Sequence, residues 1–216
     1  MIDWSAIKTV FLDMDGTLLD LHFDNHFWLV HLPLRYSQHH QLDPEQATRT
    51  VHQRIREERG SLNWYCVDYW TEELGVDIAA LKAEIKDRIG YRPHVETFLQ
   101  RLRDRGYRVV IVTNAHHKAV ALKMAVTGLD RKVDRVISTH SYGLPKEDPA
   151  FWRKLQQDEP FDPATTLLID DSGPVLDSAR QFGIAHLLAV LAPDLQQPPR
   201  DVPGHQGFHH FDEVMP

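Results

Sequence analysis

The sequence predicts an α/β protein with a Rossmann-like, doubly wound parallel sheet and a helical insertion after the first strand. The first observation is a set of continuous apolar runs, typical of strands buried on both faces, at residues 7–12, 108–112 and 166–169. Each run ends abruptly in Asp, Thr or Asn. The second observation is the presence of helix patterns between these runs, which favours crossover connections and therefore parallel strands.

The domain organisation follows from where this alternation stops. From about residue 21 to residue 91 the patterns are helical only: apolar stripes occur at Phe23, Phe27, Val30 and Leu34 and again at Ile78, Leu81 and Ile85, with a helix start at Asp43-Pro44. We therefore expect a core formed by residues 1–20 and 92–216, with a helical insertion at 21–91.

The rest of the core can be assigned in chain order. A helix that starts at Pro93 is expected to end at Gly106, and a helix over 118–127 is expected to end at Gly128. Further strands are expected at 134–138 and 185–191, with a helix between Pro174 and Gly183. Beyond residue 193 the composition shifts to Pro, Gln, His and Asp, which predicts an irregular segment with 208–214 packing back on the core.

Composition limits the classes of function. The formal charge of -7 and the pI near 6.0 argue against a general nucleic-acid-binding surface, although a small phosphorylated ligand is compatible with them. No apolar run reaches the roughly 18 residues of a membrane-spanning helix, so no membrane partner is expected. Cys66 is the only cysteine, which excludes an internal disulfide and fits a reducing, cytoplasmic location.

Neither Cys66 nor the histidines show a functional pattern. We interpret Cys66 as a small buried apolar residue rather than a nucleophile. The 14 histidines include adjacent pairs such as His39-His40 and His116-His117 but lack the spacing of a zinc site. We interpret them as solvated or packed side chains.

Chemically useful side chains follow the predicted strands. Asp13 and Asp15 follow the first strand, Thr113 ends the next, and Asp170 ends the strand at 166–169. Parallel strands joined by right-handed crossovers place all their carboxyl ends at one edge, where open α/β sheets bind ligands. Two carboxylates beside a hydroxyl and a helix start favour a site for a cation and an anion.

Four segments resemble motifs of the haloacid dehalogenase-like hydrolase superfamily, and they occur in its order over nearly the whole chain. They are Asp13-Met14-Asp15-Gly16-Thr17, Thr113-Asn114, Gly143-Leu144-Pro145-Lys146-Glu147-Asp148-Pro149 and Asp170-Asp171. In the third motif Glu147 stands where the superfamily usually has Pro.

The resemblance implies a fold with a helical cap in the insertion and a phosphomonoesterase mechanism. Asp13 would be the nucleophile, Asp15 the general acid and base, and Thr113, Asn114 and Lys146 the phosphate-binding groups. The implied cofactor is Mg²⁺, held by Asp13, the main-chain carbonyl of Asp15, and Asp170, while Asp171 would orient Lys146 or a metal-bound water. An acid at position 15 disfavours the haloalkanoate dehalogenases of the superfamily, which protonate no leaving group.

Within the superfamily the chain is similar to bacterial 5'-nucleotidases that act on GMP and IMP. A purine nucleotide substrate would meet the cap, and the candidates for contacts with base or sugar are Trp28, Arg35, Trp64 and Arg92. A sugar-phosphate or phosphoglycolate phosphatase, a sugar-phosphate mutase and a non-catalytic phosphometabolite-binding module stay open as alternatives. The presence of both Asp13 and Asp15 favours an enzyme.

Overall fold

The structure is a computed structural model that describes residues 2–216. Within these residues six parallel strands form one sheet in the order β3-β2-β1-β4-β5-β6. The strands are β1 (Thr9–Leu12), β2 (Arg108–Thr113), β3 (Arg135–Ser138), β4 (Thr166–Asp170), β5 (His186–Val190) and β6 (Gly207–Phe208). The chain order reverses on either side of β1, so the carboxyl end of β1 lies at the topological switch point of the sheet.

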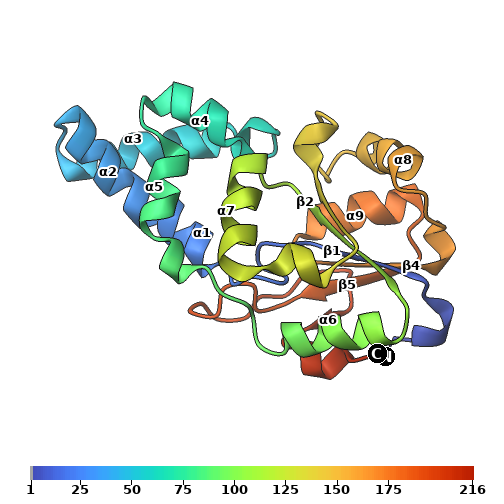
Figure 1. The fold of residues 1–216 in the computed structure, drawn as a ribbon. Helices are drawn as coiled ribbons and strands as arrows, with labels where there is room; N and C mark the ends of the chain where they lie inside the picture. The colour runs from blue at the N-terminus through green and yellow to red at the C-terminus, as the bar shows by residue number, and fades with distance from the viewer. Residues whose placement is uncertain (1) are drawn as a thin grey trace.

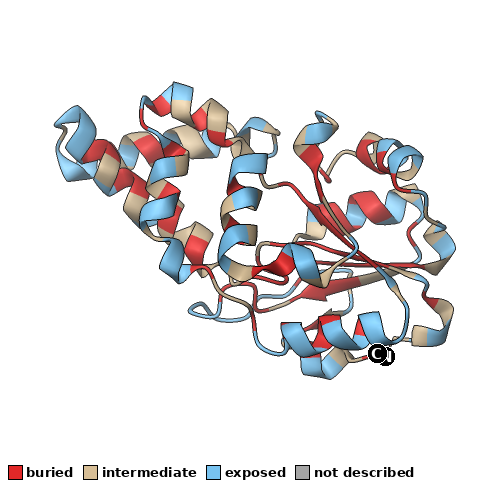
Figure 2. Ribbon diagram, in the orientation of Figure 1, coloured by how far each residue is buried: buried red, intermediate tan, exposed pale blue. Residues whose placement is uncertain are grey.

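Helices cover both faces of the sheet (Figure 1). Along β1, Val10 and Leu12 point into the core formed with α6 (Val95–Asp104), while Phe11 points into the core formed with α8 (Pro149–Asp158) and α9 (Gly173–Phe182). Apolar residues of α7 (His117–Thr127) pack on the α6 side. All of β4, and all of β1 and β2 after their first residues, are buried (Figure 2), which confirms the interpretation of the continuous apolar runs.

The inserted segment is helical, with a separate apolar cluster of its own. Its helices are α1 (His22–His26), α2 (Leu32–His40), α3 (Pro44–Glu57), α4 (Val67–Leu74) and α5 (Ile78–Glu84), which lie together beside the sheet in Figure 1. The two connections to the core lie side by side, since Leu19 and Tyr91 form an antiparallel bridge. We refer to residues 21–91 as the cap, and these boundaries stay a prediction.

The first cap helix differs from the sequence prediction after Phe27. Residues 27–31 form a π turn between α1 and α2, in which the N–H of Leu32 donates to the carbonyl of Phe27. A π turn adds one residue, which rotates the following side chains by roughly 100° about the helix axis. Phe27 is therefore buried, but Val30 and Leu34 are 53% and 50% exposed, and the predicted stripe is wrong at these two positions.

The prediction also differs from the structure at two smaller points. His94 is left-handed, with φ of 64°, so α6 begins at Val95 and Pro93 precedes the helix. The short strand β6 was not predicted, because two residues carry no periodicity. The expected return of the C-terminal segment is confirmed, since Phe211 packs against Phe98 of α6 at 4.5 Å between ring centroids.

Across residues 2–216, every helix is too short or too polar to cross a lipid bilayer.

Candidate active site

Two predicted catalytic side chains and a predicted metal ligand meet at the carboxyl edge of the sheet. Asp13 directly follows β1, Asp170 ends β4, and Lys146 comes from the loop before α8. The Lys146 ammonium donates to Asp13 Oδ1 at 2.5 Å and to Asp170 Oδ2 at 2.6 Å. All three side chains are almost fully buried. Asp13 is 133 residues and Asp170 is 24 residues from Lys146 along the chain, so the fold brings these distant segments together as predicted.

The buried carboxylates carry more negative charge than Lys146 balances. Burial raises the pKa of Asp13 to about 6, although the charge of Lys146 opposes this. Burial, together with the charges of Asp170 and Asp13, raises the pKa of Asp171 to about 8. Oxygens of Asp13, Asp170 and Asp171 lie within 4.8 Å of one another. Such a group of oxygen donors fits a hard divalent cation.

Asp171 does not contact Lys146 in the way that the sequence suggested. Its carboxylate accepts a hydrogen bond from Arg200 at 2.6 Å, and it packs against the turn at Gly16. A Cβ on Gly16 would lie 3.0 Å from Asp171 Cγ, and Gly16 has φ of 86°. The turn after Asp15 therefore requires glycine both for its conformation and for its contact with Asp171. The predicted orientation of Lys146 by Asp171 is therefore wrong, whereas the alternative role of Asp171 toward a metal-bound water stays a prediction.

The side chain of Asn114 holds the loop that carries Lys146. Its Oδ1 accepts from the N–H of Lys146 at 2.9 Å, and its Nδ2 donates to Glu147 at 2.8 Å. Glu147 also accepts from the hydroxyl of Tyr65 in the cap at 2.7 Å. The Asn114 side chain is thus engaged in positioning this loop, which leaves the main chain of Asn114 and the neighbouring Thr113 hydroxyl for the predicted phosphate contact. The unusual Glu147 links the cap to the loop.

A chain of four charges, in which the two lysines are buried and the two carboxylates partly buried, connects Asp15 to the cap, and sequence reasoning missed it. Lys123 of α7 lies 2.6 Å from Asp15 Oδ1 and 2.7 Å from Asp24 Oδ2. Asp24 of α1 is in turn 2.8 Å from Lys82 of α5. Burial raises the pKa of Asp15 to about 6, with Lys123 opposing. Although burial opposes its charged form, Asp15 and Asp24 raise the pKa of Lys123 to about 12.

The helix positions of both lysines indicate burial. Lys82 lies four residues after Ile78, on the apolar stripe of its helix, where a charged side chain must find a buried partner. Lys123 likewise lies four residues after the buried Ala119. Their partners are 58 and 99 residues away, so the pairing itself could not be predicted from local pattern.

The four cap candidates occupy different environments. Trp28 packs edge-on against Trp70, and Trp64 packs against Tyr65 at 4.7 Å between ring centroids. Arg35 is bound to Glu84 at 2.7 Å and to Gln38 within the cap.

Arg92 has a different role from the predicted substrate contact. It is 2% exposed, and its guanidinium donates to the main-chain carbonyls of Thr17, Ala192 and His209. These bonds tie together three distant segments of the core. Arg92 therefore stabilises the core next to the cap connections, and the prediction that it contacts the base or sugar of a substrate is wrong.

Comparison with known proteins adds to this geometry. The haloacid dehalogenase-like hydrolase family matches residues 7–183. The chain is 39% identical to the GMP/IMP nucleotidase YrfG of Escherichia coli K12, over all of this chain and 97% of that protein. A protein of the same name from Shigella flexneri matches equally well.

Solved structures share the fold. A HAD phosphatase from Thermococcus onnurineus aligns with a TM-score of 0.80 at 21% identity, over 96% of both chains. The putative beta-phosphoglucomutase from Thermotoga maritima aligns with a TM-score of 0.69 at 16% identity, again over 96% of both chains. These similarities confirm the predicted Rossmann-like α/β core.

Proposed function

The chain belongs to the haloacid dehalogenase-like hydrolase family, and from this premise we propose that it hydrolyses purine nucleoside 5'-monophosphates, GMP and IMP, through an aspartyl-phosphate at Asp13. Membership of the family makes it a hydrolase. The observation that carries the proposal is the meeting of Lys146 with Asp13 and Asp170 at the switch point of the sheet. A buried carboxylate beside a buried ammonium suits attack on an anionic ester.

The carboxylate group fits the Mg²⁺ that the family implies. Asp13, Asp170 and the main-chain carbonyl of Asp15 are the proposed ligands, and the proximity of Asp171 makes it a further one. The buried carboxylates there lack enough positive charge, which is the condition that a divalent cation relieves. When bound, Mg²⁺ screens the repulsion between the Asp13 carboxylate and the phosphate.

The reaction then proceeds through two displacements at phosphorus. The Asp13 carboxylate forms a bond to phosphorus as the ester P–O bond breaks, and Asp15 donates its proton to the departing nucleoside oxygen. A water molecule attacks the phosphoryl group on Asp13, Asp15 takes the water proton, and the Asp13 carboxylate is released with inorganic phosphate. Lys146, the Thr113 hydroxyl and the neighbouring main-chain N–H groups stabilise the charge on the phosphoryl oxygens.

Lys123 is a positioning residue in this scheme. Its ammonium holds the Asp15 carboxylate from the side of α7 and, through Asp24, couples it to the cap. The orientation of the acid and base is therefore fixed by buried ion pairs rather than by solvent. Lys146 has the corresponding contact on Asp13.

The purine assignment rests on the 39% identical relatives and on the aromatic cap. Trp28 and Trp64 stay the candidates for stacking on the base, a contact worth roughly 1–3 kcal/mol per stacked base in single-stranded nucleic-acid complexes. Arg35 is a weaker candidate, because Glu84 already binds its guanidinium. A nucleoside monophosphate is thus the proposed partner, and the cytoplasmic location stays a prediction.

Phosphate release with Mg²⁺ from a panel of nucleotides and sugar phosphates tests this function. We expect GMP and IMP to have the highest kcat/KM, with glucose 6-phosphate and phosphoglycolate well below them. Turnover of sugar phosphates alone would reject the purine assignment. A failure to release phosphate from any of these esters would favour the non-catalytic binding module.

A further inference from the structure

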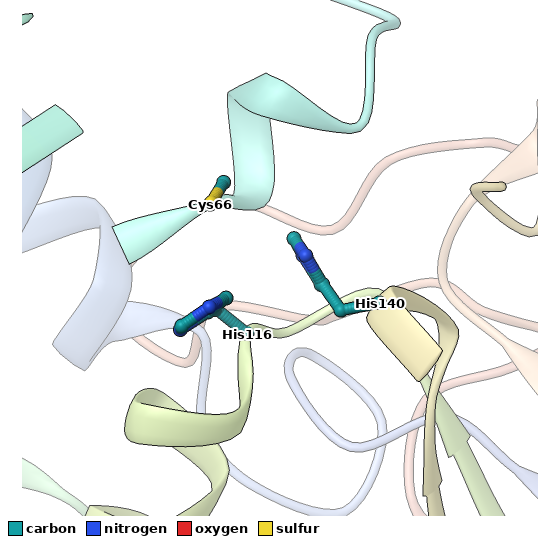
Figure 3. A group of neighbouring side chains, drawn as sticks. All are labelled: Cys66, His116 and His140. Carbon is teal, nitrogen blue, oxygen red and sulfur yellow. The ribbon is translucent and has the colours of Figure 1, made fainter. Parts of the chain in front are cut away.

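A second cluster of potential metal ligands lies at the contact between cap and core. It consists of Cys66, His116 and His140, which surround a common space in Figure 3. The Cys66 sulfur and one ring nitrogen of each histidine lie within 4.8 Å of one another. Cys66 precedes α4 of the cap, whereas His116 and His140 follow β2 and β3 of the core. Separate parts of the fold thus supply the cluster.

His140 contributes a nitrogen that is available for a ligand. Its Nε2 is buried and has no hydrogen-bond partner within residues 2–216. Burial lowers the pKa of His140 to about 4, so the ring is neutral at neutral pH. A neutral imidazole nitrogen is a common metal ligand, and a buried nitrogen without a partner is unfavourable in its absence.

The other two side chains are held only by long contacts. The N–H of Tyr69 reaches Cys66 Sγ at 3.4 Å, and the N–H of Lys118 reaches His116 Nδ1 at 3.4 Å. On its other side, His116 Nε2 lies 3.7 Å from a carboxylate oxygen of Asp68, two residues after Cys66. Rotation of either ligand would break one weak contact, and Asp68 is within reach as a fourth donor.

We propose that Cys66, His116 and His140 bind a transition-metal ion of the Zn²⁺ class and that this ion fastens the cap to the core. One thiolate and two imidazoles are typical of Zn²⁺ and Co²⁺ and unlike the oxygen donors that Mg²⁺ prefers. Zinc bonds of about 2.0–2.3 Å require the ligand atoms to approach by roughly 1 Å. Binding releases the Cys66 thiol proton to solvent and forms the sulfur–metal bond.

The position of the site gives the ion its effect. Cys66 is next to Tyr65, whose hydroxyl contacts Glu147 beside Lys146. A metal bond at Cys66 would therefore hold the cap segment at 63–74 against the loop that carries the catalytic lysine. This consequence concerns cap motion and can be measured without any turnover.

Cobalt titration of the full chain in saturating Mg²⁺ tests the site directly. We expect one equivalent of Co²⁺ to produce a thiolate-to-metal charge-transfer absorption, which Zn²⁺ then removes. Because Cys66 is the only cysteine, this absorption cannot arise elsewhere in the chain. Zn²⁺ should also slow amide hydrogen exchange in residues 63–74.

Two variants and a matched control make the test decisive. Cys66→Ser keeps a good helix N-cap but removes the sulfur, so it should abolish the absorption and weaken Zn²⁺ binding by roughly 100-fold or more. His140→Asn should also weaken binding, whereas His39→Ala, on the exposed cap surface, should not. A folded wild-type protein without the absorption, or equal Zn²⁺ affinity in Cys66→Ser, would overturn the proposal.

Discussion

Lys123 offers the sharpest test of the buried charge chain. Replacing it with Met keeps the length and apolar stem of the side chain but leaves Asp15 without its cation, while Asp24 keeps Lys82. Removing one partner of a buried ion pair costs about 3–5 kcal/mol. For a protein of this size that loss lowers Tm by about 6–20 °C.

The control lies on the same helix. Lys118 of α7 pairs with Asp68 at 2.6 Å, but both side chains are about half exposed. An exposed pair contributes about 0–1 kcal/mol, so Lys118→Met should unfold at nearly the same urea concentration as the wild type. The two variants differ in burial rather than in chemistry.

Activity provides an independent measurement on the same variant. If Lys123 positions Asp15, Lys123→Met should lower kcat/KM, which reports the phosphorylation of Asp13, most for nucleotides, whose leaving oxygen needs a proton, and least for p-nitrophenyl phosphate, whose leaving group does not. Equal stability of Lys123→Met and Lys118→Met, or an equal loss of kcat/KM with both esters, would refute the role given to Lys123.

Three further predictions concern the cap contact, acid stability and the metal. Tyr65→Phe removes the hydrogen bond from the Tyr65 hydroxyl to the Glu147 carboxylate and should raise KM for GMP about tenfold, an effect of about 1.4 kcal/mol. Tyr69→Phe, which changes a contact within the cap, should leave this KM unchanged. Equal effects of the two variants would contradict the link through Glu147. Burial places the pKa of His140 at about 4 in the folded protein, below its unfolded value near 6.5, so unfolding takes up a proton in this range. The free energy of unfolding, measured with urea, should therefore fall as the pH drops from 6.5 toward 4. His140→Asn should make this pH dependence weaker. An unchanged pH dependence in the variant would contradict the burial of a neutral His140. Mg²⁺ should raise Tm of the wild type but much less that of Asp170→Asn, and equal shifts would argue against Asp170 as a ligand.

Much of this site could be predicted from local sequence. Asp13, Thr113 and Asp170 each stand where a continuous apolar run stops, and such runs form neighbouring parallel strands whose ends meet. Register then follows, since Leu12 pairs with both Ile111 and Ile169. To predict that these strand ends lie at one edge, it was enough to know which segments are parallel strands and that their crossover connections are right-handed.

The remaining features depend on contacts between distant segments. The helix positions of Lys123 and Lys82 indicate burial, but only the fold places their shared partner Asp24 between them. A positively charged side chain beside the cap suggests a substrate contact, but Arg92 donates to three main-chain carbonyls that are 75 to 117 residues away. The π turn after Phe27 likewise shifts a helix face without any change in local pattern. Such features are set by tertiary packing, which overrides propensity.

The most direct test of the proposed chemistry is a rapid-mixing experiment on Asp15→Asn with p-nitrophenyl phosphate. This leaving group needs no acid, so Asp13 should still be phosphorylated, but no base remains to activate water for the second step. We predict a burst of nitrophenol stoichiometric with enzyme, followed by very slow turnover, and a phosphoryl group on the peptide that contains Asp13. A phosphoryl group found on another residue would contradict the assignment of Asp13 as nucleophile, and steady turnover without a burst would contradict the assignment of Asp15 as the base.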